Sequence, residues 1–267
     1  MMKEKILNAL TTECPWRDTL YWYDTIDSTN TKAKEMARSG AVHGTVIAAG
    51  HQSAGRGRLG RSFCSDEGMG VYLSVILRPA CKPEQLMHLT CAAAVAACNA
   101  VEAAAGIKPG IKWINDLIVG KKKLGGILTE LSADPSTGLI EYAVIGIGIN
   151  CAQSEKDFPE DLAQIATSLN METCKQTPPS LLAAELIRQL AIMDHMLFTH
   201  KSAIMDAYKA NCVTLGQDVM LNRADTISYA KAVDLDENGS LLVQFPDGNT
   251  QWVQSGEASI RGMYGYV

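Results

Sequence analysis

The sequence predicts an α+β protein, in which a mixed β-sheet flanked by helices is followed by a small all-β domain. Up to residue 213, apolar runs typical of buried strands alternate with long helix-forming segments. From residue 214 onward, short β segments follow one another, and the turn sequences Asn238-Gly239 and Asp247-Gly248 separate some of them. We therefore expect two domains, residues 1–213 and residues 214–267, with a β-barrel or sandwich as the second.

The first domain carries a signal for each predicted element. Ser28-Thr29-Asn30-Thr31 precedes a run of helix formers that ends near Gly40, which predicts a helix. Further helices are predicted at 83–105, 181–198 and 202–212. Apolar runs predict strands at 45–49, 71–77, 111–114 and 140–149, and a hairpin of 117–119 with 124–131. In the second domain, strands are predicted at 219–222, 227–233, 241–245, 251–253 and 258–261.

Composition excludes several classes of protein. The chain has 267 residues, of which 47% are hydrophobic, enough for one large and one small core. Its net charge of −5 argues against binding DNA through an overall basic field. No targeting signal is visible, and the apolar segment 91–107 is interrupted by Asn99 and Glu102, which favours a buried helix over a membrane span.

Eight cysteines occur without a C-x-x-C pair. This favours reduced thiols in a cytoplasmic protein over a zinc site or a disulfide framework. The five histidines show no metal-ligand spacing, so we predict no metal ligands in the chain.

The segment Gly55-Arg56-Gly57-Arg58-Leu59-Gly60-Arg61, called here the Arg loop, predicts an anion site. Its glycines allow backbone N–H groups to approach a ligand, and its arginines donate to phosphate or carboxylate. A solvated surface loop and a Gly/Arg-rich RNA-binding segment are the alternatives, although the latter are usually longer. No Walker sequence is present, so any nucleotide must be held in another way.

Two further segments point to the same chemistry. In Lys112-Trp113-Ile114-Asn115-Asp116, a strand lysine beside an amide and a carboxylate could neutralise phosphate charge, although an ordinary strand end with a turn is the better explanation of this segment taken alone. In Ile145-Gly146-Ile147-Gly148-Ile149-Asn150, alternating glycines suit a strand that a ligand or another backbone approaches closely. Lys121-Lys122-Lys123 is by default a solvated hairpin tip.

In order and spacing, six segments resemble the biotin–protein ligase family across nearly the whole chain. They are Asp27-Ser28-Thr29-Asn30, Gln52 to Arg58, Lys112 to Leu117, Lys123 to Glu130, Ile145 to Asn150 and Gly256-Glu257-Ala258-Ser259-Ile260-Arg261. The sequence departs from the family pattern at three positions: Leu59 stands where a further arginine is usual, Phe63 where tryptophan is frequent, and Ile114 where proline is usual.

This resemblance implies a biotin–[acetyl-CoA-carboxylase] ligase whose C-terminal domain is an SH3-like barrel. Such an enzyme activates biotin with ATP, accompanied by Mg²⁺, and transfers it to a lysine of a biotin carboxyl carrier protein domain. The implied catalytic residues are Lys112 and Arg58. The implied biotin-binding residues are Ser28, Thr29, Asn30, Gln52, Arg56, Gly57, Arg58 and Lys112. The implied nucleotide-binding residues are Arg56, Arg58, Arg61, Lys112, Asn115 and Asn150. The Arg loop is expected to become ordered around ligand.

Three other functions compete with this hypothesis. A lipoate–protein ligase would share the adenylate chemistry, a nucleic-acid-binding protein could use the Arg loop and the lysine tip, and a degenerate relative would lack activity. Some family members carry an N-terminal winged helix that represses genes. Only about 25 residues precede Ser28, too few for a domain, so we expect neither a repressor role nor DNA binding. A homodimer is possible.

Overall fold

The computed structural model describes residues 1–173, 175–223, 226–255 and 259–262, and its centre is a seven-stranded sheet. The strand order is β1 (Leu20–Ile26), β2 (Thr45–Gln52), β3 (Gly70–Leu77), β7 (Ile140–Asn150), β6 (Lys122–Ala133), β5 (Asp116–Val119) and β4 (Gly110–Lys112). Strands β1 and β2 pair in parallel, whereas the other neighbours pair antiparallel. The predicted mixed sheet is therefore confirmed.

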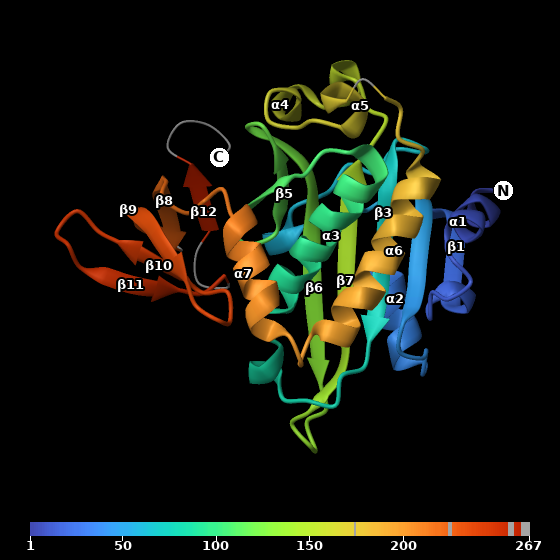
Figure 1. Cartoon of the computed structure of the whole chain (residues 1–267), viewed down its shortest axis with the longest axis horizontal. Helices are drawn as coiled ribbons and strands as arrows, with labels where there is room; N and C mark the ends of the chain where they lie inside the picture. Colours follow the sequence, from blue (N-terminus) through green and yellow to red (C-terminus); the bar gives the residue numbers. More distant parts are fainter. Residues whose placement is uncertain (174, 224–225, 256–258, 263–267) are drawn as a thin grey trace.

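Helices cover both faces of this sheet (Figure 1). Helices α3 (Leu89–Ala105) and α6 (Pro179–Met196) pack on one face, with α1 (Met2–Ala9) and α7 (Lys201–Asn211) beside them. Helix α2 (Thr29–Arg38) lies on the other face, where it forms a separate small core with β2, β3 and β7. Because side chains alternate along a strand, Val75 of β3 joins the large core while Ser74 and Ile76 point toward α2.

Short elements complete the first part of the chain. The α-helical ones are α4 (Glu160–Ala163) and α5 (Leu169–Glu172). The 3-10 helices are η1 (Arg17–Thr19), η2 (Arg58–Gly60), η3 (Pro83–Leu86) and η4 (Glu155–Asp157). The segment around α4 joins the β5–β6 hairpin through hydrogen bonds between the backbones of Lys123 and Ile165 and of Thr167 and Lys123.

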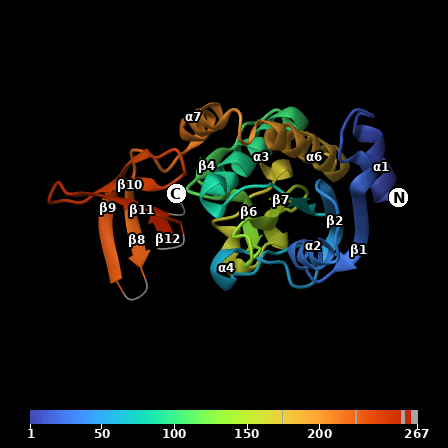
Figure 2. The same ribbon diagram turned by 90° about the horizontal axis from the view of Figure 1, so that it is seen from below.

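A second, five-stranded antiparallel sheet follows α7 (Figure 2). Its strand order is β11 (Thr250–Val253), β10 (Leu241–Gln244), β9 (Thr226–Leu235), β8 (Asp218–Arg223) and β12 (Ser259–Gly262). The indole Nε1 of Trp113 donates to the carbonyl oxygen of Gly239 over 2.8 Å, and the Trp113 backbone N–H donates to Oγ1 of Thr214. The predicted small β domain is confirmed, and its core is continuous with that of the larger part.

The structure also corrects the predicted element boundaries. The predicted helix at 83–105 is divided into η3 and α3, and the strand predicted at 111–114 ends at Lys112. Helix α1 and strand β1 were not predicted. In the motif Gly256 to Arg261, residues 256–258 lie outside the described residues, whereas the backbone of 259–261 belongs to β12.

One segment of the described residues is long and apolar enough to cross a membrane, judged by its length and composition alone. It covers residues 83–105, and 67% of its most apolar window is buried inside the fold, as in the core helix of a folded domain. The segment 83–105 is therefore part of the protein core.

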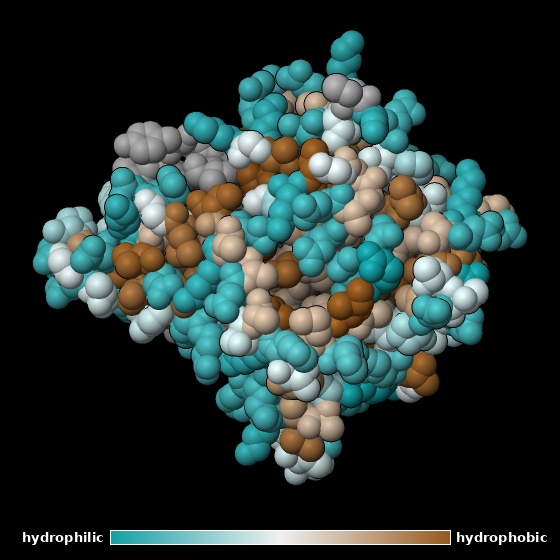
Figure 3. All heavy atoms as spheres, in the orientation of Figure 1, coloured by the Kyte–Doolittle hydropathy of each residue, from teal (hydrophilic) through white to brown (hydrophobic). Residues whose placement is uncertain are grey.

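Figure 3 shows hydrophilic residues over much of one face of the molecule, with hydrophobic ones scattered between them.

Candidate active site

The predicted site residues line one cavity of about 540 Å³. It lies at the N-terminus of α2, under the Arg loop and beside strands β4 to β7, with the segment around α4 along one side. Its volume is in the range of small-molecule sites. The lining includes every residue that the resemblance implied: Ser28, Thr29, Asn30, Gln52, Arg56, Gly57, Arg58, Arg61, Lys112, Asn115 and Asn150.

Buried neutral polar groups form one end of this cavity. Oε1 of Gln52 accepts from the backbone N–H of Thr29 over 2.8 Å, and Nε2 of Gln52 donates to Oγ of Ser65. Oγ of Ser74 lies 2.6 Å from Oδ1 of Asn30. Because the amide oxygen can only accept, the Ser74 hydroxyl donates its proton there. These bonds fix the side chains of Gln52 and Asn30 before any ligand arrives.

The glycines of β7 make room for side chains. A Cβ atom at Gly146 would overlap the Asn30 amide, and one at Gly148 would lie 2.6 Å from the Phe63 ring. The sequence predicted the close approach of a ligand or another backbone to this strand. The structure shows that Asn30 and Phe63, two side chains of the site, approach it, and that Gly146 and Gly148 also line the cavity.

The other end of the cavity is cationic. Arg58 donates through Nη1 to Oδ1 of Asn115 over 2.9 Å and through Nη2 to the carbonyl oxygen of Ser255 over 2.5 Å. Asn115 is held in turn, because its Nδ2 donates to the carbonyl oxygen of Ile127. Burial lowers the pKa of the Arg58 guanidinium, although the charge of Asp116 opposes this shift. The group still carries its charge, since arginine does not deprotonate in proteins.

Cations far outnumber anions around the cavity. The basic residues of the lining are Arg56, Arg58, Arg61, Lys112 and Lys123, whereas Asp116 is the one acidic residue among the described lining residues. Nζ of Lys123 forms an ion pair with Oδ1 of Asp116 at 2.7 Å, and Lys112 is 7% exposed. A group with this charge balance attracts carboxylate or phosphate.

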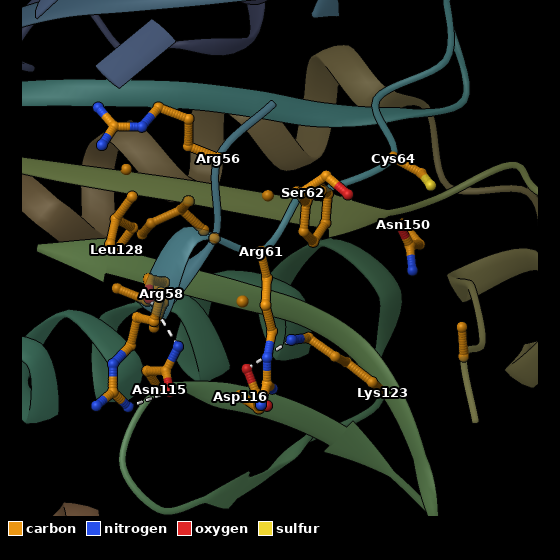
Figure 4. A pocket seen from close by; sticks show the side chains of 18 of the residues that line it. Arg56, Arg58, Arg61, Ser62, Cys64, Asn115, Asp116, Lys123, Leu128 and Asn150 are labelled. Atoms are coloured by element: carbon orange, nitrogen blue, oxygen red, sulfur yellow. Dashed lines mark hydrogen bonds and ion pairs between the residues drawn. The ribbon is translucent and has the colours of Figure 1, made fainter. Parts of the chain in front are cut away.

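The arginines of the Arg loop diverge, as Figure 4 shows: Arg58 and Arg61 extend toward Asn115 and Asp116, whereas Arg56 extends away from them. Nη1 of Arg56 lies 3.4 Å from Oε1 of Glu130. The Arg loop therefore faces two parts of the site at once.

Asn150 lies at a third side of the cavity, at the end of β7. Its Nδ2 donates to the carbonyl oxygen of Thr167 over 2.9 Å, and its Oδ1 accepts from Nε2 of Gln153 over 3.3 Å. Asn150 is buried, so these contacts hold its amide in one orientation.

Sequence reasoning missed part of the lining. Residues Phe158, Leu162, Ile165 and Ala166 contribute apolar surface, and Lys123 was assigned to a solvated tip. The residues around α4 gave no sequence signal, because the helix is four residues long and begins with Glu160 and Asp161. The ion pair of Lys123 and Asp116 runs diagonally across the β5–β6 hairpin, in which Asp116 pairs with Gly126 and Lys123 pairs with Ile118. The predicted hairpin places both residues on neighbouring strands, so the contact could have been suspected.

Two family models match the chain. The Biotin/lipoate A/B protein ligase family matches residues 22–150, and the Biotin protein ligase C terminal domain matches residues 214–261. The bifunctional ligase/repressor BirA of Bacillus subtilis is 35% identical over 240 residues, covering 86% of this chain and 70% of that protein. The biotin–[acetyl-CoA-carboxylase] ligase of Mycobacterium tuberculosis is 31% identical, covering 86% of this chain and 84% of that protein.

Solved structures agree with these matches. The biotin protein ligase of Aquifex aeolicus, solved in complex with biotin and ATP, superimposes with a TM-score of 0.76 at 28% identity, covering 91% of this chain and 98% of that one. The chain belongs to the Biotin/lipoate A/B protein ligase family. Within that family, both matched domains and the relatives place it among the biotin protein ligases.

Proposed function

We propose that this chain activates biotin as biotinyl-5'-AMP and transfers the biotinyl group to a lysine of a carrier protein. The observation that supports this most directly is the composition of the cavity at the N-terminus of α2, which has buried neutral polar groups at one end and five basic residues among its lining. Biotin has the matching polarity, since its ring system is neutral and its carboxylate is charged. The relative from Mycobacterium tuberculosis is named for the same activity.

In the first step, the biotin carboxylate attacks the α-phosphorus of ATP, and the bond to the β-phosphate oxygen breaks to release pyrophosphate. In the second step, the lysine amine attacks the acyl carbon and AMP leaves. Both steps shift negative charge on oxygen atoms, so fixed cationic donors should contribute most to the rate. No side chain needs to act as a covalent nucleophile.

The roles of the site residues in this proposal are those that the resemblance implied, and the positions of these residues in the cavity support them. Ser28, Thr29, Asn30 and Gln52 would bind the biotin ring system, because they are buried polar groups at the neutral end. Arg56, Gly57, Arg58 and Lys112 would bind the carboxylate and the α-phosphate, and Arg61, Asn115 and Asn150 the rest of the nucleotide. Of these, Lys112 and Arg58 would be catalytic.

Magnesium would enter with the nucleotide. The described residues contain no cluster of three His, Cys, Asp or Glu side chains placed to hold a metal ion. Phosphate oxygens of ATP and water molecules would supply oxygen ligands of Mg²⁺, as at other nucleotide sites. The ion would neutralise phosphate charge when bound.

The acceptor in this proposal is a biotin carboxyl carrier domain of a carboxylase, supported by the name of the relative from Mycobacterium tuberculosis. A cytoplasmic location is part of the same proposal, because ATP and carboxylases are found there. The division at residue 213, the absence of DNA binding and a homodimer stay predictions.

The proposal is tested by incubating the purified chain with MgATP and biotin and measuring pyrophosphate and biotinyl-5'-AMP by mass spectrometry, with lipoate in a parallel reaction. We expect biotin-dependent adenylate, reduced by about 100-fold or more in Lys112→Ala, as found when one preorganised donor to a developing charge is removed. Adenylate with lipoate alone would identify a lipoate ligase instead. A folded chain that forms neither adenylate would disprove the proposal.

A further inference from the structure

Glu130 of β6 is absent from the cavity lining, yet it contacts two residues that belong to it. Nδ2 of Asn30 donates to Oε2 of Glu130 over 2.9 Å, and Nη1 of Arg56 lies 3.4 Å from Oε1. Asn30 comes from α2 and Arg56 from the Arg loop. One carboxylate on a central strand thus lies between the neutral end of the cavity and the loop that covers it.

A second cation, Lys34, competes with Arg56 for the same oxygen. Nζ of Lys34, one turn after Asn30 on α2, lies 2.7 Å from Oε1 of Glu130. Partial burial works toward a raised pKa of Glu130, but the hydrogen bonds from Lys34 and Asn30 and the charge of Arg56 outweigh it and hold the pKa below its usual value. Glu130 is therefore a charged group that Lys34 and Arg56 share.

The two cavity residues that contact Glu130 differ in their exposure. Asn30 is 3% exposed and is confined by Gly146 and Ser74, whereas the Arg56 side chain is 44% exposed. Glu130 is fixed on a strand that is paired with β7. Since an exposed arginine has many rotamers, a fixed negative charge beside it restricts where its guanidinium lies.

We propose that Glu130 is a positioning residue that fixes Asn30 and Arg56 together and so sets the distance between the site for the biotin ring and the site for its carboxylate. This inference rests on the proposed function. In this inference Lys34 weakens the contact between Glu130 and Arg56, because its Nζ competes with the Arg56 guanidinium for Oε1. Glu130 itself touches no reacting atom.

The first test needs no catalysis. Limited trypsin digestion of the ligand-free chain, followed by mass spectrometry, measures cleavage after the arginines of the Arg loop. Glu130→Gln should increase the cleavage rate about threefold or more, because the Arg loop loses the ion pair between Arg56 and Glu130 that restricts its motion. Lys34→Met should leave the rate equal or lower. Glu35→Gln is the matched control, since Glu35 is an exposed α2 carboxylate paired with Lys32.

Melting temperatures of all variants distinguish a local change from a general loss of stability. The inference is wrong if Glu130→Gln, like the control Glu35→Gln, is cleaved in the Arg loop at the rate of the unchanged chain. It is also wrong if cleavage of Glu130→Gln increases equally at sites outside the loop.

The second test is a double-mutant cycle on the KM for biotin in adenylate formation. Glu130→Gln should raise this KM about threefold to tenfold, the effect of a charge-assisted contact between partly exposed groups. In an Arg56→Met background the same substitution should have a smaller effect, because the contact with Arg56 is already gone and only the one with Asn30 remains to be weakened. Equal effects in both backgrounds would show a merely structural role. Adenylate formation by the unchanged chain tests the proposed function separately.

Discussion

A methyl group at position 146 would occupy the place of the Asn30 amide. Because Asn30 is buried and bonded to Ser74 and Glu130, it cannot move aside without breaking these bonds. We expect Gly146→Ala to lower the free energy of unfolding by about 1–3 kcal/mol, the usual cost of overpacking. The KM for biotin should also rise by more than about tenfold, as expected when a fixed contact is displaced.

Urea unfolding and adenylate kinetics measure both effects, and Gly126→Ala provides the comparison for stability. A Cβ atom at Gly126 would lie 3.4 Å from its nearest neighbours, which is ordinary contact with Asp116 and the flexible Lys123 side chain. Its effect on stability should stay within about 0.5 kcal/mol, as for substitutions without a packing cost. Equal effects of the two alanines would contradict the explanation based on Asn30.

At the scale of single residues, the sequence indicates functional residues where the residue type is unusual for the predicted element or where it belongs to a family motif. Arg58 and Lys112 were assigned roles because their segments occur in the order and spacing of the biotin–protein ligase family, since each segment alone also has an ordinary structural explanation. Glu130 was not assigned a role, since a glutamate at a strand end is ordinary. Its importance depends on Asn30, 100 positions earlier, and on Arg56, so only the tertiary structure reveals it.

Among the described residues, Leu59 of η2 in the Arg loop is the one residue other than glycine with a positive φ. Leu59 has φ 56° and ψ 36°, a left-handed conformation that costs an L-residue other than glycine or asparagine about 1–2 kcal/mol. Its side chain is 68% exposed, so little burial compensates for this cost. We expect Leu59→Asn to raise the free energy of unfolding by about 0.5–1 kcal/mol, because asparagine tolerates this conformation.

The β-branched substitution Leu59→Val should have the opposite sign and lower stability by about 1 kcal/mol or more. Thermal melting of the ligand-free chain compares the two variants directly. If the asparagine variant is the less stable of the two, the loop does not hold this conformation in solution.

Elements with a strong local pattern were predicted, and the others were not. Helix α2 begins within Ser28-Thr29-Asn30 as its hydroxyl and amide residues indicate, and β3 follows its apolar run. Strand β1 was missed, although its Tyr, Trp, Thr and Ile residues favour strands, because half-exposed aromatics hide the alternation. The helix predicted from Pro83 begins at Leu89, because the residues before it form the separate turn η3.

At the scale of the whole molecule, the two sheets share one hydrophobic core, although the sequence pattern divides the chain into two domains. Val219, Leu221 and Val243 of the second sheet belong to the same buried cluster as Leu117 of the first sheet and Trp113 in the turn between β4 and β5. The sequence predicted two domains because its pattern changes near residue 214, but a pattern does not reveal the contacts between them. Trp113 supplies such a contact through its indole bond to Gly239.

We therefore expect one cooperative unfolding transition, in which the calorimetric and van't Hoff enthalpies agree. Trp113→Phe leaves the buried carbonyl group of Gly239 without its donor, which costs about 1–3 kcal/mol and lowers the single Tm by roughly 2–9 °C for a chain of this size. Trp252→Phe on β11 is the matched control, since its indole is 47% exposed, and it should shift Tm by less than about 1 °C. Two separate transitions in the unchanged chain, or equal shifts in both variants, would mean that the second sheet folds as an independent unit.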